Sequence, residues 1–187
     1  MALTNLLVPT YLQMLKALSA WLDKAKGQLS EAEAEALLSA RLAPDMFPLS
    51  TQIRFACVQA REGACRLQGE AFPAAIEELL NEGRAAGDQP GSLADAQARI
   101  AETVALLEAL APDALDADPE SPIAHALPAG MIFDLTAQQY ARDWALPQFY
   151  FHVMIAYAIL RAEGVELGKA DYVSHMFAYM RPGTLPS

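Results

Sequence analysis

One long stretch without charge, between Pro147 and Arg161, most constrains the fold of this chain. Its side chains carry no full charge, and large apolar groups point in every direction of a helical wheel. A helix that is apolar all round is normally buried at the centre of a protein. The sequence therefore predicts a central helix, closed by Gly164. Its one group that titrates near neutral pH is His152, with Gln148 one turn earlier on the same face.

The composition of the whole chain favours helix over sheet. Ala and Leu are abundant, whereas Val, Ile and Thr are sparse. A length of 187 residues suits one domain with a substantial core. We therefore expect residues 1–187 to form a single all-α domain, a four-helix bundle with short extra helices.

Helical periodicity and end signals place the other predicted elements. The predicted long helices besides the central one cover residues 3–26, 48–68 and 92–111, and shorter ones cover 31–39, 137–144 and 169–180. Pro9 lies inside the first helix, so its first turns are offset or it starts nearer Val8. Residues 72–80 fit two helical turns, and 83–91 fit a flexible loop.

One segment, residues 122–135, favours strand over helix. Ile123, His125 and Leu127 alternate with smaller residues, and the following Pro128–Gly130 can form a turn before a second apolar run. The sequence therefore predicts a small β-ribbon near 122–135.

The charge and the cysteines limit the classes of partner and compartment. A net charge of -10 repels phosphate backbones and anionic lipid, so nucleic acid and membrane are not expected partners. The start of the chain lacks a signal-peptide pattern, and the apolar run at 149–160 is too short to span a bilayer. Cys57 and Cys65 lie about 12 Å apart along one predicted helix, which excludes an intrahelical disulfide. We expect inert, reduced thiols in a cytoplasmic protein.

Two motif blocks are similar to a known family. The first is Arg41–Leu49 (RLAPDMFPL), and the second starts with Leu146–His152 (LPQFYFH) and continues through AYAILR at 156–161 to LGK at 167–169. They resemble the DUF1993 family, within the DinB/YfiT-like superfamily of proposed metalloenzymes. The resemblance covers nearly the whole chain and is weakest around 73–91 and beyond 171.

The resemblance implies a DinB-like four-helix bundle, often a homodimer. Better-known relatives bind a divalent metal through three histidines, one on the second helix and an H-x-x-x-H pair on the last. Some relatives use this site for thiol transfer with bacillithiol or mycothiol. In this sequence the pair falls on Gln148 and His152, and the nearest candidate on the second helix is Gln52. Glutamine is a weak ligand for zinc or nickel, so the resemblance implies a metal site that is degenerate or absent.

Two acidic residues are candidates for a role beside His152. Asp143 or Asp45 could orient His152 or bind a metal together with it. Asp45 could instead cap the helix at 48–68. His152 itself has an alternative interpretation, a core histidine bonded to a carbonyl or a neighbouring side chain. We expect His125 and His175 on the surface.

Two functional hypotheses from different classes follow. The sequence has no Gly-rich phosphate loop, G-x-S-x-G elbow, C-x-x-C or H-E-x-x-H motif. The first hypothesis is a polar pocket between helices around His152, a degenerate site of a metal-dependent transferase or hydrolase for a small molecule. The alternative is a non-catalytic, dimeric binding or stress-response protein without metal.

Overall fold

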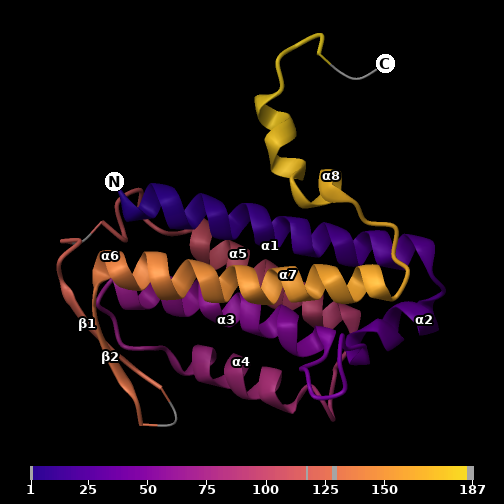
Figure 1. The fold of residues 1–187 in the computed structure, drawn as a ribbon, viewed down its shortest axis with the longest axis horizontal. Coiled ribbons are helices and arrows are strands. Elements are labelled where there is room, and N and C mark those ends of the chain that lie inside the picture. Colours follow the sequence, from indigo (N-terminus) through magenta and orange to yellow (C-terminus); the bar gives the residue numbers. More distant parts are fainter. Residues whose placement is uncertain (1, 117, 128–129, 185–187) are drawn as a thin grey trace.

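The computed structural model describes residues 2–116, 118–127 and 130–184. The long helices lie alongside one another and form a bundle, with a β-hairpin at one end (Figure 1). The C-terminal segment extends away from the bundle on the side of α1. The bundle helices are α1 (Leu3–Gln28), α3 (Leu49–Leu67), α5 (Leu93–Glu108) and α7 (Leu146–Ala162). Helices α1 and α3 each contact both α5 and α7, so the four helices enclose one core. The predicted all-α bundle is confirmed.

The shorter helices connect and cover this bundle. They are α2 (Glu31–Ala36) with η1 (Leu37–Ser39), α4 (Ala74–Ala85), α6 (Ala137–Gln139), η2 (Tyr140–Ala145), α8 (Lys169–Tyr172) and η3 (Ser174–Tyr179). Helix α4 runs five residues beyond the two turns predicted at 72–80. It packs against α3, which buries Ile76 and Leu79.

Most helices begin and end close to the predicted residues, at capping side chains and at glycines. Ser30, Ser92 and Thr136 each form a capping box, in which the cap side chain and the third helical residue exchange hydrogen bonds. Gly69 and Gly164 follow α3 and α7 with φ of 72° and 84°, a conformation that glycine adopts without steric cost. The start near Val8 is wrong, because α1 runs unbroken through Pro9 from Leu3.

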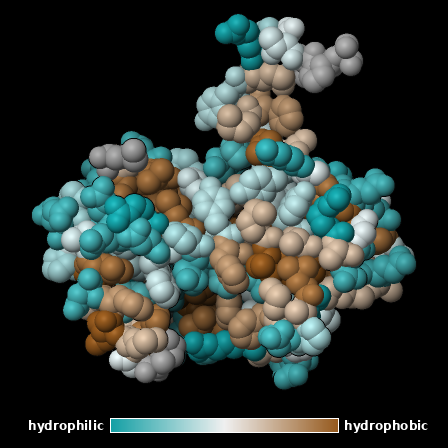
Figure 2. Space-filling model, in the orientation of Figure 1, coloured by the Kyte–Doolittle hydropathy of each residue, from teal (hydrophilic) through white to brown (hydrophobic). Residues whose placement is uncertain are grey.

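Helix α7 departs from the expectation that it is buried on every side. One face, with Phe149, Val153 and Ala156, is fully buried, but Phe151 and Met154 on the opposite face are 54% and 40% exposed. Helix α7 lies at the front of Figure 1, and Figure 2 shows apolar surface on that front. Its lack of charge therefore reflects an apolar outer face as well as a core.

A π-helical segment, η2, precedes α7. Its last turn includes a hydrogen bond from Leu146 N to Ala141 O, five residues back. Pro147 follows directly and has no N–H to donate. The wider π turn leads into α7, which begins at Leu146 with Pro147 in its first turn.

The predicted β-ribbon is confirmed. Strands β1 (Pro122–Ala126) and β2 (Ile132–Thr136) pair antiparallel, with His125 opposite Phe133. Of the predicted turn, Pro128 and Ala129 lie outside the described residues, and Gly130 has a φ of 82°. Ile123 and His125 face the bundle and are buried.

An ion-pair network fixes α4 and α5 against α3. The carboxylate of Glu82 on α4 accepts hydrogen bonds from Arg54 Nε at 2.6 Å and from Arg99 Nε at 3.0 Å. Arg99 and Arg61 both reach Glu102 on α5. The Arg54 side chain is only 2% exposed, so Glu82 neutralises a charge in the core.

Two further predictions concern cysteines and membranes. Cys57 and Cys65 are both free and buried, and burial raises the pKa of the Cys57 thiol to about 11. Protonated thiols of this kind are poor nucleophiles, in agreement with the sequence-based prediction. Across the described ranges, no helix combines the length and apolar character needed to cross a membrane.

Candidate functional site

His152 and Gln52, two of the three residues at the metal positions implied by the resemblance, are in contact. His152 projects from α7 and Gln52 from α3, and these two helices pack directly together. The Nδ1 atom of His152 lies 2.9 Å from Oε1 of Gln52. Both side chains are buried, with 9% and 2% of their surface exposed.

The backbone of Phe47 sets the orientation of the Gln52 amide. Gln52 Nε2 donates to the Phe47 carbonyl at 3.1 Å, in the connector that precedes α3. The amide oxygen must then face His152, since the opposite orientation would place two acceptor oxygens together. It follows that His152 carries its proton on Nδ1 and donates to Gln52. The lone pair is on Nε2, which has no hydrogen-bond partner among the described residues.

The surroundings of His152 keep its ring neutral. Burial lowers the pKa of His152 from 6.5 to about 4, because the charged imidazolium would lose its hydration. Aromatic rings supply much of this environment: Phe55 and Phe151 each meet the imidazole edge to face at a centroid distance of 5.3 Å. Phe47 packs in turn on Phe55 at 5.6 Å and is half exposed. The imidazole therefore has an aromatic rim that reaches the surface.

The other site candidates do not reach His152. Gln148 is half-buried one turn earlier on α7, and in the described part of the chain it makes no hydrogen bond to His152 or Gln52. Asp143 is exposed on η2 and forms a bidentate salt bridge with Arg142, with both N–O distances at 2.7 Å. Asp45 is exposed in the connector, and the cap position of α3 is Pro48 without a side-chain cap, so the capping role predicted for Asp45 is wrong.

The donor set does not fit a tightly held zinc or nickel ion. Within residues 2–116, 118–127 and 130–184, no three His, Cys, Asp or Glu side chains are grouped so that they could hold a metal. Around His152 there is one imidazole, and both ends of the Gln52 amide are already engaged. Gln52 occupies the position of a group that orients a histidine rather than one that binds metal beside it.

His125 is not at the surface, contrary to prediction. It is 4% exposed and packs on Trp144 and Tyr140 at centroid distances of 4.3 and 5.4 Å. The strand alternation that revealed the ribbon also put His125 on the same face as Ile123, which was the signal for its burial. His175 is half-buried, so it is only in part a surface residue.

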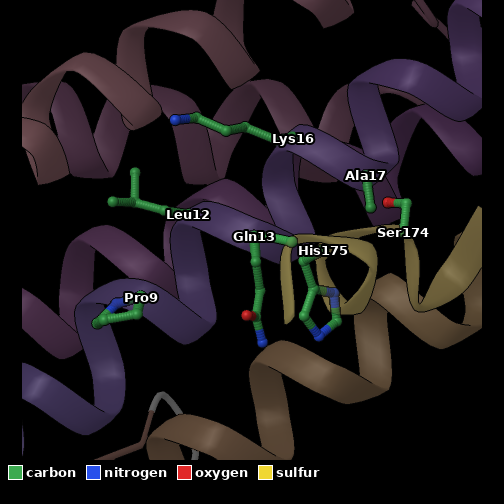
Figure 3. A pocket seen from close by; sticks show the side chains of 8 residues that line it. Pro9, Leu12, Gln13, Lys16, Ala17, Ser174 and His175 are labelled. Carbon is green, nitrogen blue, oxygen red and sulfur yellow. The ribbon is translucent and has the colours of Figure 1, made fainter. Parts of the chain in front are cut away.

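A cleft of about 500 Å³ lies between α1 and η3, away from His152. Figure 3 shows the side chains of Gln13 and His175 close together in it, while Lys16 extends away from them. Lys16 pairs with Glu108 at 2.6 Å. The lining residues are Pro9, Leu12, Gln13, Lys16, Ala17, Ser174, His175 and Ala178. This cleft was not predicted, since it forms only where the C-terminal segment crosses α1.

The fold is a helical bundle of the DinB type. A crystal structure of a DinB family member protein from Shewanella denitrificans at 1.83 Å resolution is similar, with a TM-score of 0.73 and 32% sequence identity. The match covers 98% of this chain and 96% of that one. The family model described as a domain of unknown function, DUF1993, matches residues 3–173. The chain belongs to the DUF1993 family, as the motif blocks predicted. No curated protein matches the sequence.

Proposed function

We propose that this DinB-like protein binds a small polar molecule at His152, in a degenerate form of the DinB-type site. The observation that supports the proposal is the chain of hydrogen bonds from His152 through Gln52 to the Phe47 carbonyl. It holds the imidazole in one tautomer, with Nε2 free to accept a hydrogen bond. A core histidine that serves only packing does not need an oriented ring with one unused nitrogen.

The ligand that suits this environment carries a hydrogen-bond donor next to an apolar body. Nε2 accepts from an O–H, N–H or S–H group, and the rings of Phe47, Phe55 and Phe151 offer apolar contact. Binding is favoured over general-base catalysis, because a pKa of about 4 leaves His152 a weak base at neutral pH. A transferase or hydrolase assisted by zinc or nickel is the second candidate from the family resemblance.

One set of titrations tests binding and separates these candidates. Phenol and benzyl alcohol serve as probes with a donor, and toluene as the matched probe without one. We expect saturable shifts of the His152 imidazole resonances with the first two and none with toluene. A Gln52→Leu variant should weaken binding by about tenfold, the usual effect of losing one orienting hydrogen bond.

The same protein, purified without chelator or histidine tag, is soaked in zinc or nickel and analysed for metal. Near one metal per chain, lost in His152→Ala, would overturn the metal-free proposal and favour the transferase or hydrolase candidate. Equal shifts with toluene and phenol would overturn the role of Nε2.

A homodimer through α7 is a further part of this proposal. Phe151 and Met154 expose apolar surface on a helix face that has no charge before Arg161. In a chain with a net charge of -10, two copies repel each other least where such faces meet. We expect Phe151→Lys to convert a dimer to a monomer in sedimentation experiments, whereas Leu106→Lys, on the exposed side of α5, should not. A monomeric wild-type protein would contradict this.

A further inference from the structure

A second group of polar side chains lies beneath the β-hairpin and is here called the hairpin cluster. It consists of His125 and Tyr140, which are buried, and Trp144 and Arg66, which are half-buried. The His125 ring packs on Trp144 and Tyr140, and the Arg66 guanidinium lies 5.7 Å from the centre of the Tyr140 ring. Arg66 comes from α3, the two aromatic residues from η2 and His125 from β1. Figure 1 shows the hairpin running past the end of the bundle where α6 leads into α7. This cluster is separate from the His152 site.

Four nitrogen atoms of the hairpin cluster lack hydrogen-bond partners. Both ring nitrogens of His125, Nε1 of Trp144 and Nε of Arg66 are buried, and none has a partner among the residues that the structure describes. His125 as a whole is 96% buried, given its exposure of 4%. Buried polar groups without partners are rare in folded proteins, because each has given up its bonds with water. Several in contact with one another indicate that a common partner is missing.

An acceptor with negative charge would satisfy three of these four nitrogen atoms. Trp144 Nε1 and Arg66 Nε can only donate, and neutral His125 donates from one ring nitrogen. Arg66 has no carboxylate within 4.0 Å in the described ranges, although it is half-buried. Its guanidinium instead stacks on Phe72 at 4.6 Å. Glu62, one turn earlier on α3, is the nearby acid: burial raises the pKa of its carboxyl group, whereas Arg66 and Arg84 lower it.

The cluster lies close to the surface, since Arg66 and Trp144 are only half-buried. Among the residues that the structure describes, the sheet consists of β1 and β2 alone, so each strand has one edge without a strand partner. Phe133, opposite His125, is 42% exposed and lies 6.1 Å from Trp144 between ring centres. Phe133 is therefore a partly exposed aromatic side chain at the edge of the cluster. The π-helical turn that carries Tyr140 and Trp144 is of a type frequent at functional sites.

We propose that the hairpin cluster is a binding site for a small anion, a phosphate or a carboxylate, held by Arg66, His125 and Trp144. Arg66 supplies the charge, and the N–H groups of His125 and Trp144 supply two further donors. The proposal does not depend on the function proposed for His152, since the two sites share no residue.

The test is a titration of the full chain with inorganic phosphate and with acetate at constant ionic strength. Acetamide has nearly the shape of acetate without its charge and is the matched probe. The chain has three His and two Trp residues, so single substitutions assign every imidazole and indole N–H signal. We expect the Trp144 and His125 signals to shift saturably with phosphate or acetate and not with acetamide. The relative affinities for phosphate and acetate identify the kind of anion.

A pair of arginine variants ties the response to the cluster. Arg66→Met should weaken anion binding by about tenfold or more, as expected for loss of a charge-assisted hydrogen bond. Arg142→Met, on the surface of the same end of the bundle, should leave it unchanged. No shift with either anion, or equal shifts with acetamide, would mean that the cluster holds only water and would overturn the proposal. If Arg66→Met does not fold, the wild-type titration still decides between these outcomes.

Discussion

The amide oxygen of Gln52 on α3 lies 2.9 Å from Nδ1 of His152 on α7, although the two residues are 100 positions apart in the sequence. This contact replaces what the family resemblance implies at the same positions, two histidines facing one metal. An amide that is fixed by a backbone carbonyl orients the imidazole through a hydrogen bond instead. The pair offers one imidazole and one amide whose two ends are already engaged, a donor set that zinc sites do not use.

Gln52→Glu tests this orientation through the pKa of His152. A carboxylate next to Nδ1 stabilises the imidazolium, so the pKa of His152 should rise above its value of about 4. The pKa is measured by following the imidazole resonances with pH. Asp143→Asn is the control, because Asp143 contacts Arg142 and not His152. An unchanged pKa in Gln52→Glu would contradict the contact.

His152 should also make the free energy of unfolding depend on pH. Its pKa is about 4 in the folded state and near 6.5 when unfolded, so between these values the unfolded state binds the extra proton. Stability should therefore fall as the pH drops from 6.5 toward 4, by about 3 kcal/mol in total at 1.36 kcal/mol per pKa unit. Urea denaturation of wild type and His152→Gln at several pH values isolates this contribution as their difference. A difference independent of pH would exclude a buried neutral histidine.

The ion pair of Glu82 with Arg54 should be important for stability. Glu82→Gln leaves the guanidinium of Arg54 in the core without its countercharge, which should cost about 3 kcal/mol. The matched control is Asp143→Asn, which breaks an exposed pair and should not change the melting temperature measurably. Equal effects of the two substitutions in thermal unfolding would show that Arg54 is hydrated in the folded protein.

The parts of this fold that depend on neighbouring residues in the chain were predictable from the sequence. Capping boxes at Ser30, Ser92 and Thr136 and the glycines after α3 and α7 are short-range signals, so these helix ends were predictable. The antiparallel ribbon was predictable from alternation within one segment. The pairing of Gln52 with His152 was implied only by the family motif, because residues on two helices meet through packing that no local pattern encodes.

The failures share a different physical cause. The sequence predicts His125 at the surface, but its ring packs on Tyr140 and Trp144 of η2, which lie outside its own strand. The π turn lies where the preceding helical segment meets Pro147. The sequence shows the proline but contains no signal for the type of turn before it. The apolar outer face of α7 resembles core in its composition, since composition alone does not distinguish a buried face from an uncovered one.

Gly63 provides the last prediction, about the packing of α3 against α1. A Cβ at this position would lie 2.6 Å from the hydroxyl oxygen of Tyr11, whose side chain is fully buried. Because Tyr11 packs on Phe149 at 4.8 Å, it has little room to withdraw, and Gly63→Ala should destabilise the fold by about 1–3 kcal/mol. Gly27→Ala is the control: it lies in the last turn of α1 with nothing within 4 Å of its Cβ. Helix propensity predicts that this second change stabilises the protein by up to about 1 kcal/mol. Denaturant unfolding of both variants measures the two effects, and a gain of stability in Gly63→Ala would show that α1 and α3 are not in close contact at this position.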